Sequence, residues 1–235
     1  MTRPALALVL LAASIVSSAA PAHAVSSVHG GRAATVRISG LQNGSPAIGA
    51  GVIIKTDRDA LTILTAKHVA DLDDLAILTY DGKALRCIEK ITISGYDLAI
   101  VRAGLSPPRM LLGSGLRGDL FVSANASSLS DYSPVKLGTA LETAMAIHIW
   151  SYGPNAQSDL TRGRVLDTNP IFPDGPANGR FAITCAMCAP GMSGAGVFSD
   201  DGRLLGILSA GWKTSQGDLK MIEVEPLGPA LFALR

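Results

Sequence analysis

Short apolar runs separated by turn-forming residues fill the chain from residue 33 onward. No long stretch repeats its apolar positions with the 3.6-residue period of a helix, so the pattern predicts an all-β protein. The two sets of expected strands lie at 35–38, 51–54, 61–64, 75–79 and 98–101, and at 145–150, 164–167, 181–184, 196–198, 204–209 and 221–224.

The two sets of strands predict two β-barrels of similar size, one within residues 25–108 and one within residues 139–235. Residues 109–138, between them, are expected to form a linker and a surface excursion, because turn-forming and polar residues replace the apolar runs there. In the second barrel, Asp-Asp-Gly at 200–202 predicts a hairpin turn. Pro229 permits a short helix to begin near the C-terminus.

Residues 1–24 have the pattern of a secretory signal peptide. Arg3 supplies a positive charge, residues 5–16 form an apolar run, and Ala22-His23-Ala24 is a small-x-small cleavage site. The apolar run is too short to span a bilayer as a helix, and no other segment is expected to span. The pattern therefore predicts cleavage after Ala24 and a periplasmic or secreted protein without a membrane span.

Composition excludes one class of partner. The 235-residue chain has 20 Lys and Arg against 19 Asp and Glu, a formal net charge of +1, and only 17% charged residues. Such a chain has no basic reservoir to neutralise a phosphate backbone, so no nucleic-acid partner is expected.

Three cysteines, Cys87, Cys185 and Cys188, would enter an oxidising compartment with the exported chain. Cys185 and Cys188 have the spacing of a metal or redox pair, but no second close Cys or His pair completes a zinc site, so no metal is expected. Two arrangements stay open at this stage. Either one disulfide forms and leaves one buried thiol, or all three residues are small buried side chains.

Three residues supply the parts of an activated serine. His68 follows an apolar strand, so its imidazole can project from the strand end. Asp97 opens an apolar strand, where a buried carboxylate requires hydrogen-bonding partners. Ser193 lies among glycines, which permit a tight backbone that aims N–H groups inward. Acyl transfer needs this set: a nucleophile, a base, an acid that orients the base, and donors to the oxyanion.

Together, and in this order, the three motifs resemble the trypsin/chymotrypsin-like serine peptidase family. The sequence Thr-Ala-Lys-His at 65–68 is similar to the family's Thr-Ala-Ala-His, and Asp-Leu-Ala-Ile at 97–100 is similar to its Asp-Leu/Ile-Ala-Leu. Gly-Met-Ser-Gly at 191–194 resembles the segment around the family's serine. The order His, Asp, Ser separates this family from subtilisins and α/β-hydrolases. The resemblance implies two six-stranded antiparallel β-barrels with a short C-terminal helix.

The resemblance also implies roles for these residues. Ser193 is expected to attack the scissile carbonyl, His68 to take and return the proton, and Asp97 to orient the imidazole. The N–H groups of Gly191 and Ser193 are expected to form the oxyanion hole. The chain is therefore expected to be a serine endopeptidase that acts on a protein or peptide as a monomer and needs no cofactor.

Substrate specificity rests on the same resemblance. Met187 is expected at the base of the S1 pocket with Cys188 beside it, where trypsin-like enzymes have an Asp for Lys or Arg. Leu208 stands where several glutamate-specific relatives carry a His. A small to medium apolar P1 residue is therefore expected. The strand expected to pair with extended substrate is Ser209, Ala210 and Gly211.

Two departures from the family's pattern bear on catalysis. Met192 replaces an Asp that in animal members pairs with a new N-terminal amine, so the oxyanion loop is expected to be held by its own packing. The residues after Ser193 are Gly-Ala-Gly rather than Gly-Gly-Pro. The alternative function is consequently a peptidase-fold binding module, weak or inactive in catalysis, that holds a peptide or protein.

Overall fold

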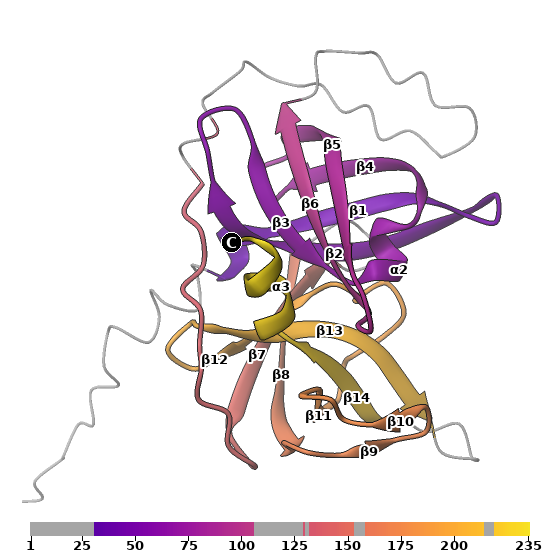
Figure 1. Ribbon diagram of the computed structural model, residues 1–235, viewed down its shortest axis with the longest axis vertical. Helices are drawn as coiled ribbons and strands as arrows, with labels where there is room; N and C mark the ends of the chain where they lie inside the picture. The colour runs from indigo at the N-terminus through magenta and orange to yellow at the C-terminus, as the bar shows by residue number, and fades with distance from the viewer. Residues whose placement is uncertain (1–30, 106–128, 130–131, 153–157, 214–218) are drawn as a thin grey trace, which may run out of the picture.

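The computed structural model describes residues 31–105, 129, 132–152, 158–213 and 219–235. These residues form two closed antiparallel β-barrels of six strands each, stacked one on the other (Figure 1). The predicted fold is confirmed, including the short C-terminal helix. The expected signal peptide, 1–24, and most of the expected linker lie outside the described residues.

The N-terminal barrel has the strand order β1-β2-β3-β6-β5-β4. Alternate side chains of its strands point inward, so Val36, Ile38 and Val52 are fully buried in one apolar cluster. Its elements are β1 (Thr35–Gln42), β2 (Ser45–Thr56), β3 (Leu61–Thr65), α2 (Lys67–Ala70), β4 (Asp73–Thr79), β5 (Ala84–Ile93) and β6 (Leu98–Leu105).

The C-terminal barrel has the order β11-β14-β13-β12-β7-β8. Its core includes the buried side chains of Ile147, Phe181 and Val197. The chain ends in α3, which returns to contact β5 and β6 of the first barrel (Figure 1). The elements are β7 (Ala146–Tyr152), β8 (Ser158–Asp167), β9 (Ile171–Phe172), β10 (Gly175–Pro176), β11 (Phe181–Cys185), β12 (Gly196–Ser199), β13 (Leu204–Lys213), β14 (Leu219–Pro226) and α3 (Gly228–Ala233).

Three features differ from the sequence-based expectation. Strand β5 was not among the expected strands because charged residues such as Glu89 and Lys90 interrupt its apolar pattern, and most of its side chains are exposed. The two-residue strands β9 and β10 are too short to give a pattern. His68 lies in the single helical turn α2 rather than directly at the end of β3. Among the described residues, no helix is long and apolar enough to cross a membrane.

The end of the connection between the barrels is pinned to both of them. Val135 N donates to Ile53 O at 3.2 Å, and Gly138 N donates to Leu204 O at 2.7 Å. The buried Tyr132 hydroxyl donates to Asp81 Oδ1 at 2.5 Å. Burial raises the pKa of Asp81, but the hydrogen bonds from Thr79 and Tyr132 outweigh burial, so its pKa is lowered. The tyrosine therefore ties the connection to an ionised carboxylate of the first barrel.

Replacing Tyr132 by Phe is expected to reduce the free energy of unfolding by about 1–2 kcal/mol, because the Asp81 carboxylate loses a donor while the ring stays in place. Tyr80→Phe is the matched control, since Tyr80 is half exposed and packs edge-on against the same ring. Urea unfolding of both variants measures the difference. Equal stabilities would show that the Tyr132 hydroxyl contributes nothing to the fold.

Candidate active site

The fold brings the three sequence motifs to the boundary between the barrels. His68 comes from α2, Asp97 from the turn before β6, and Ser193 from the loop before β12. The His68 Nδ1 and Asp97 Oδ2 atoms are 2.7 Å apart. His68 and Ser193 line one cleft of about 420 Å³, together with Gly191 and the β1–β2 hairpin. An imidazole and a hydroxyl therefore share one cleft, and the carboxylate paired with the imidazole lies beside it.

Asp97 receives hydrogen bonds from both barrels. His68 of the first barrel donates its backbone N–H to Oδ1 at 3.0 Å, and its ring lies on Oδ2. Ser209 of the second barrel donates its hydroxyl to Oδ2 at 2.6 Å. Burial raises the pKa of Asp97, but the hydrogen bonds from His68 and Ser209 outweigh burial and lower it. Asp97 is therefore an anion at neutral pH, with three hydrogen-bond donors on its two oxygens.

The same contact changes the basicity of His68. The hydrogen bond to Asp97 raises the pKa of His68 above 6.5, and this effect exceeds the opposing effect of burial. Because Nδ1 faces the carboxylate, the neutral ring carries its proton on Nδ1 and leaves Nε2 as the acceptor. This is the tautomer that a general base requires.

The Ser193 hydroxyl is turned away from the imidazole. Its Oγ donates to Ser209 O at 3.1 Å. Within the part of the chain that the structure describes, no hydrogen bond joins Ser193 to His68. A rotation of the serine side chain is needed before its proton can pass to Nε2, as is common for catalytic hydrogen bonds in unliganded sites.

The backbone around Ser193 is fixed against the other barrel. Ala50 N of β2 donates to Ser193 O at 2.8 Å, and Gly194 N donates to Leu208 O at 2.7 Å. Gly194 has φ +85°, and a Cβ there would lie 2.0 Å from Ala50 O. Only glycine fits a backbone that approaches β2 this closely. The serine is therefore held where the barrels meet.

The preceding loop carries the two N–H groups that the sequence predicts as oxyanion-hole donors, those of Gly191 and Ser193. Neither Gly191 nor Ser193 uses its N–H in a backbone hydrogen bond with another described residue. Met192 between them is buried in the core of the second barrel, and its sulfur accepts a hydrogen bond from Ala189 N at 3.3 Å. Apolar packing therefore holds this loop at the position where animal relatives are expected to use an ion pair.

The two alternatives for the cysteines are resolved by the structure. Cys185 and Cys188 form a disulfide, and Cys87 is a free, half-buried thiol whose pKa is raised mainly by burial. The disulfide closes a small loop immediately before the Ala189–Ser193 segment. Met187 lies on this loop and is 74% exposed, so its side chain is on the surface of the loop rather than at the bottom of a buried pocket.

The strand expected to pair with substrate is interrupted by a bulge. Leu208 pairs with Val224 and Gly211 pairs with Ile222, so the register of β13 shifts at Ser209 and Ala210. Ser209 is buried and contacts both Asp97 and Ser193, whereas Gly211 is exposed. The bulge thus places one residue of the strand inside the site and leaves the next ones at the surface.

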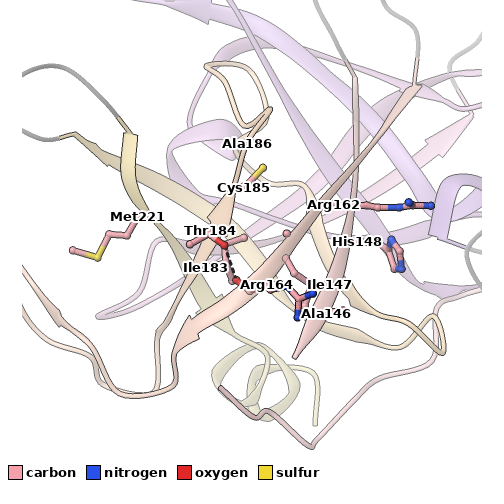
Figure 2. Close-up of a pocket in the computed structure, with 11 residues that line it drawn as sticks. Ala146, Ile147, His148, Arg162, Arg164, Ile183, Thr184, Cys185, Ala186 and Met221 are labelled. Carbon is pink, nitrogen blue, oxygen red and sulfur yellow. Dashed lines mark hydrogen bonds between the residues drawn. The ribbon is translucent and has the colours of Figure 1, made fainter. Parts of the chain in front are cut away.

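A second hollow, of about 570 Å³, lies over β7, β8 and β11 and contains none of the three motif residues. Arg162 and His148 are adjacent at one end, Arg164 lies beside Ala146, and Met221 is on the opposite side (Figure 2). His148 Nε2 is 2.8 Å from an Asp200 carboxylate oxygen, which accounts for this histidine outside the site. Among the described residues, no group of His, Cys, Asp or Glu could hold a metal ion.

One residue of the site was not found from the sequence. Glu225 of β14 is buried, and its Oε1 accepts a hydrogen bond from Asp97 N at 3.1 Å. The contact joins residues 128 positions apart, so no local motif reports it. The available signal is the pair of glutamates in Met-Ile-Glu-Val-Glu, residues 221–225, where an apolar strand carries two acids.

Replacing Asp97 by Asn is expected to lower the His68 pKa by about 1 pH unit, because the hydrogen bond that most raises it is lost. The His68–Asp97 pair stabilises the fold above the unfolded Asp pKa of 3.8 and below the unfolded His pKa of 6.5, since each group binds its charge-favouring partner only in the folded state. Proton NMR titration of the imidazole measures the shift.

Asp71→Asn is the control for this experiment. Asp71 also raises the His68 pKa, but its effect is the smallest of the contributing ones, and it already pairs with Lys67. The control should therefore move the His68 pKa much less. An equal shift in the two variants would show that charge alone, and not the Asp97 hydrogen bond, controls the imidazole.

Solved structures of other proteins share this fold. Two structures of the HtrA-type protease AlgW with a tripeptide, one of a variant, match with TM-scores of 0.65 and 0.63 at 16% and 17% identity. Each match covers 90% of this chain but 62% of the AlgW chain, so the present chain spans less than two thirds of that length. The inactive form of a mutant of Rv3671c from M. tuberculosis H37Rv matches with a TM-score of 0.60 at 16% identity, over 88% of this chain and 89% of that one.

The structural matches show a shared fold, and comparison of the sequence identifies the family. A search of curated proteins finds no relative. The family model described as trypsin-like peptidase domain matches residues 49–207, which is more than half of the chain and includes His68, Asp97 and Ser193. The chain therefore belongs to the trypsin-like peptidase domain family.

Proposed function

We propose that the protein is an exported serine endopeptidase that cleaves peptide bonds through an acyl-enzyme. The observation that carries the proposal is the His68–Asp97 contact of 2.7 Å at the edge of a cleft that Ser193 also lines. A half-buried Asp, an imidazole with Nε2 available and a nearby serine are the parts of an activated nucleophile. Membership of a peptidase family supports the same reaction.

In this mechanism Ser193 first turns from the Ser209 carbonyl toward His68. The hydroxyl oxygen then attacks the scissile carbonyl while its proton passes to Nε2, and Asp97 stabilises the imidazolium. The N–H groups of Gly191 and Ser193 donate to the oxyanion. His68 gives its proton to the leaving amine, and a water activated by the same nitrogen hydrolyses the ester.

The substrate in this proposal is an extended peptide. It pairs with the strand segment Ser209–Gly211, whose register already departs from β14 at the bulge. The AlgW structures, which share the fold, contain a tripeptide. No acid stands at 187 or 188 to attract Lys or Arg, and the neighbouring Leu208 is apolar. We infer a preference for small to medium apolar P1 residues.

Two observations support a location outside the cytosol. Residues 1–24 have the charge, apolar run and cleavage site of a signal peptide. The Cys185–Cys188 disulfide needs an oxidising compartment to persist, as the periplasm or the cell exterior provides. Both point to a mature protein that works outside the cytosol.

One observation favours a second candidate function. The Ser193 hydroxyl is engaged by the Ser209 carbonyl rather than by His68. If that contact persists when a peptide enters the cleft, the fold binds peptide without cleaving it. The candidate is then a binding module for peptide or protein, and the serine reactivity decides between the two.

The wild-type protein is expected to react with a fluorophosphonate probe, and Ser193→Ala to lose all labelling. His68→Ala should slow labelling by at least ~10³-fold, because the serine loses its base. Ser39→Ala and His148→Gln are matched controls outside the cleft and should label like the wild type. Gel fluorescence over time measures the rates, and a folded wild type that never labels would favour the binding module.

Cleavage of a P1-randomised peptide library by the wild type is expected to follow small to medium apolar residues. The physical reason is that Cys188 and Leu208 provide neither an acid nor a histidine for a charged P1 side chain. Mass spectrometry of the products gives the cleavage sites. Products that end mainly in Arg, Lys or Glu would contradict the preference while leaving the proposed reaction intact.

A further inference from the structure

A buried carboxyl stands directly behind the His68–Asp97 pair. Glu225 of β14 is 1% exposed. One oxygen, Oε1, accepts the Asp97 N–H at 3.1 Å. The other, Oε2, is buried and has no hydrogen-bonding partner among the described residues. A buried carboxylate with an unsatisfied oxygen is costly, so the group favours its protonated form.

Glu223 offers a contrast on the same strand. It is 3% exposed, yet Arg180 donates to its Oε1 at 2.6 Å and Trp212 donates to its Oε2 at 3.0 Å. Glu223 therefore has a cation and two hydrogen bonds, whereas Glu225 has a single backbone donor. Of two buried acids two positions apart, only Glu225 lacks a cation partner.

The groups that act on Glu225 come from three elements. Burial is the largest influence on its pKa, and the negative charges of Glu223 on β14 and Asp97 on the β5–β6 turn act in the same direction. The Asp97 N–H and the Arg180 charge, from the turn before β11, oppose them. The balance raises the pKa of Glu225 from 4.5 to about 7. Glu225 therefore releases its proton near pH 7, and the pKa of His68 is also raised, to above 6.5.

We propose that Glu225 is a positioning residue that holds Asp97 through its backbone N–H and links the charge of His68 to a second, buried proton. The reactivity part of this inference rests on the proposed peptidase function, whereas the link between the two charges does not. Glu225 does not line the cleft, and its hydrogen bond to Asp97 is the route by which it acts on His68.

The direction of the link follows from charge. When Glu225 holds its proton, one negative charge, that of Asp97, faces the imidazole. When Glu225 releases its proton, a second negative charge lies behind the first and stabilises the imidazolium. The pKa of His68 then rises, and a higher pH is needed to obtain the neutral base. The charge of Glu225 therefore helps to set the pH at which kcat/KM rises on the acid side of its pH profile.

The same proton affects folding in a defined pH range. The folded protein binds it more tightly than the unfolded chain, because the pKa of Glu225 is about 7 in the fold and 4.5 in the unfolded state. Stability from this group is fully present below the unfolded value and is lost as the pH rises toward 7. A glutamine at position 225 still offers a side-chain oxygen that accepts the hydrogen bond from Asp97 N–H, but it cannot ionise.

The test uses the mature protein with Glu225→Gln and, as the matched control, Glu223→Gln. Imidazole NMR should show the His68 pKa lower by about 0.5 to 1 pH unit in E225Q than in the wild type. The control breaks the Arg180 ion pair and should cost stability without an equal shift of His68. An unchanged His68 pKa in E225Q, or an equal shift in E223Q, would overturn the proposal.

Thermal unfolding provides a readout that needs no activity. The melting temperature of E225Q minus that of the wild type should rise between about pH 5 and about pH 8, because only the wild type must ionise a buried acid. A difference independent of pH would overturn the link. Glu225→Leu, which leaves Asp97 N–H without an acceptor, should be the less stable variant, and rescue by Gln but not by Leu is expected.

Activity separates this proposal from the proposed function. With an active enzyme, the acid limb of kcat/KM in E225Q should move to lower pH by the same amount as the His68 pKa. With a wild type that never reacts with the fluorophosphonate, the peptidase function fails, while a His68 shift in E225Q still supports the link. With an active enzyme whose acid limb does not move, the link fails and the peptidase function stands.

Discussion

A single half-buried carboxylate, that of Asp97, is the point at which the two barrels and the candidate chemistry meet. It receives hydrogen bonds from His68 of the first barrel and from Ser209 of the second. Its own N–H is held by Glu225 of the last strand. An anion cannot be buried without such partners. The orientation of the imidazole, the position of β13 and the docking of the barrels therefore depend on one another.

The loop that carries Ser193 is held by packing rather than by hydrogen bonds to a charged group. Apolar packing of Met192 and the close approach of Gly194 to Ala50 hold the loop that carries Gly191 and Ser193. The adjacent Cys185–Cys188 disulfide closes only a short loop, so it constrains local geometry more than it restricts the unfolded chain. Hydrogen bonds to the Asp97 carboxylate thus position His68, whereas apolar packing and close backbone contact position Ser193.

Residue patterns predicted the two barrels because an alternating strand such as β1 and a continuous apolar strand such as β6 each carry their own signal. The site could be anticipated because its three parts lie in short local motifs around His68, Asp97 and Ser193. Strand β5 could not be predicted from the sequence, because its charged residues, which face solvent on the barrel wall, interrupt the apolar pattern. Glu225 was out of reach for another reason: its role comes from a contact between barrels that only the folded chain creates.

We expect His68, Asp97 and Ser193 to form a working nucleophilic site once a peptide enters the cleft. A crystal structure of the mature protein with a peptide aldehyde tests it most directly. We expect a hemiacetal on Ser193 Oγ, with the former aldehyde oxygen about 2.7–3.1 Å from the backbone nitrogens of Gly191 and Ser193. A peptide bound without a covalent bond, with Ser193 still donating to Ser209 O, would contradict it.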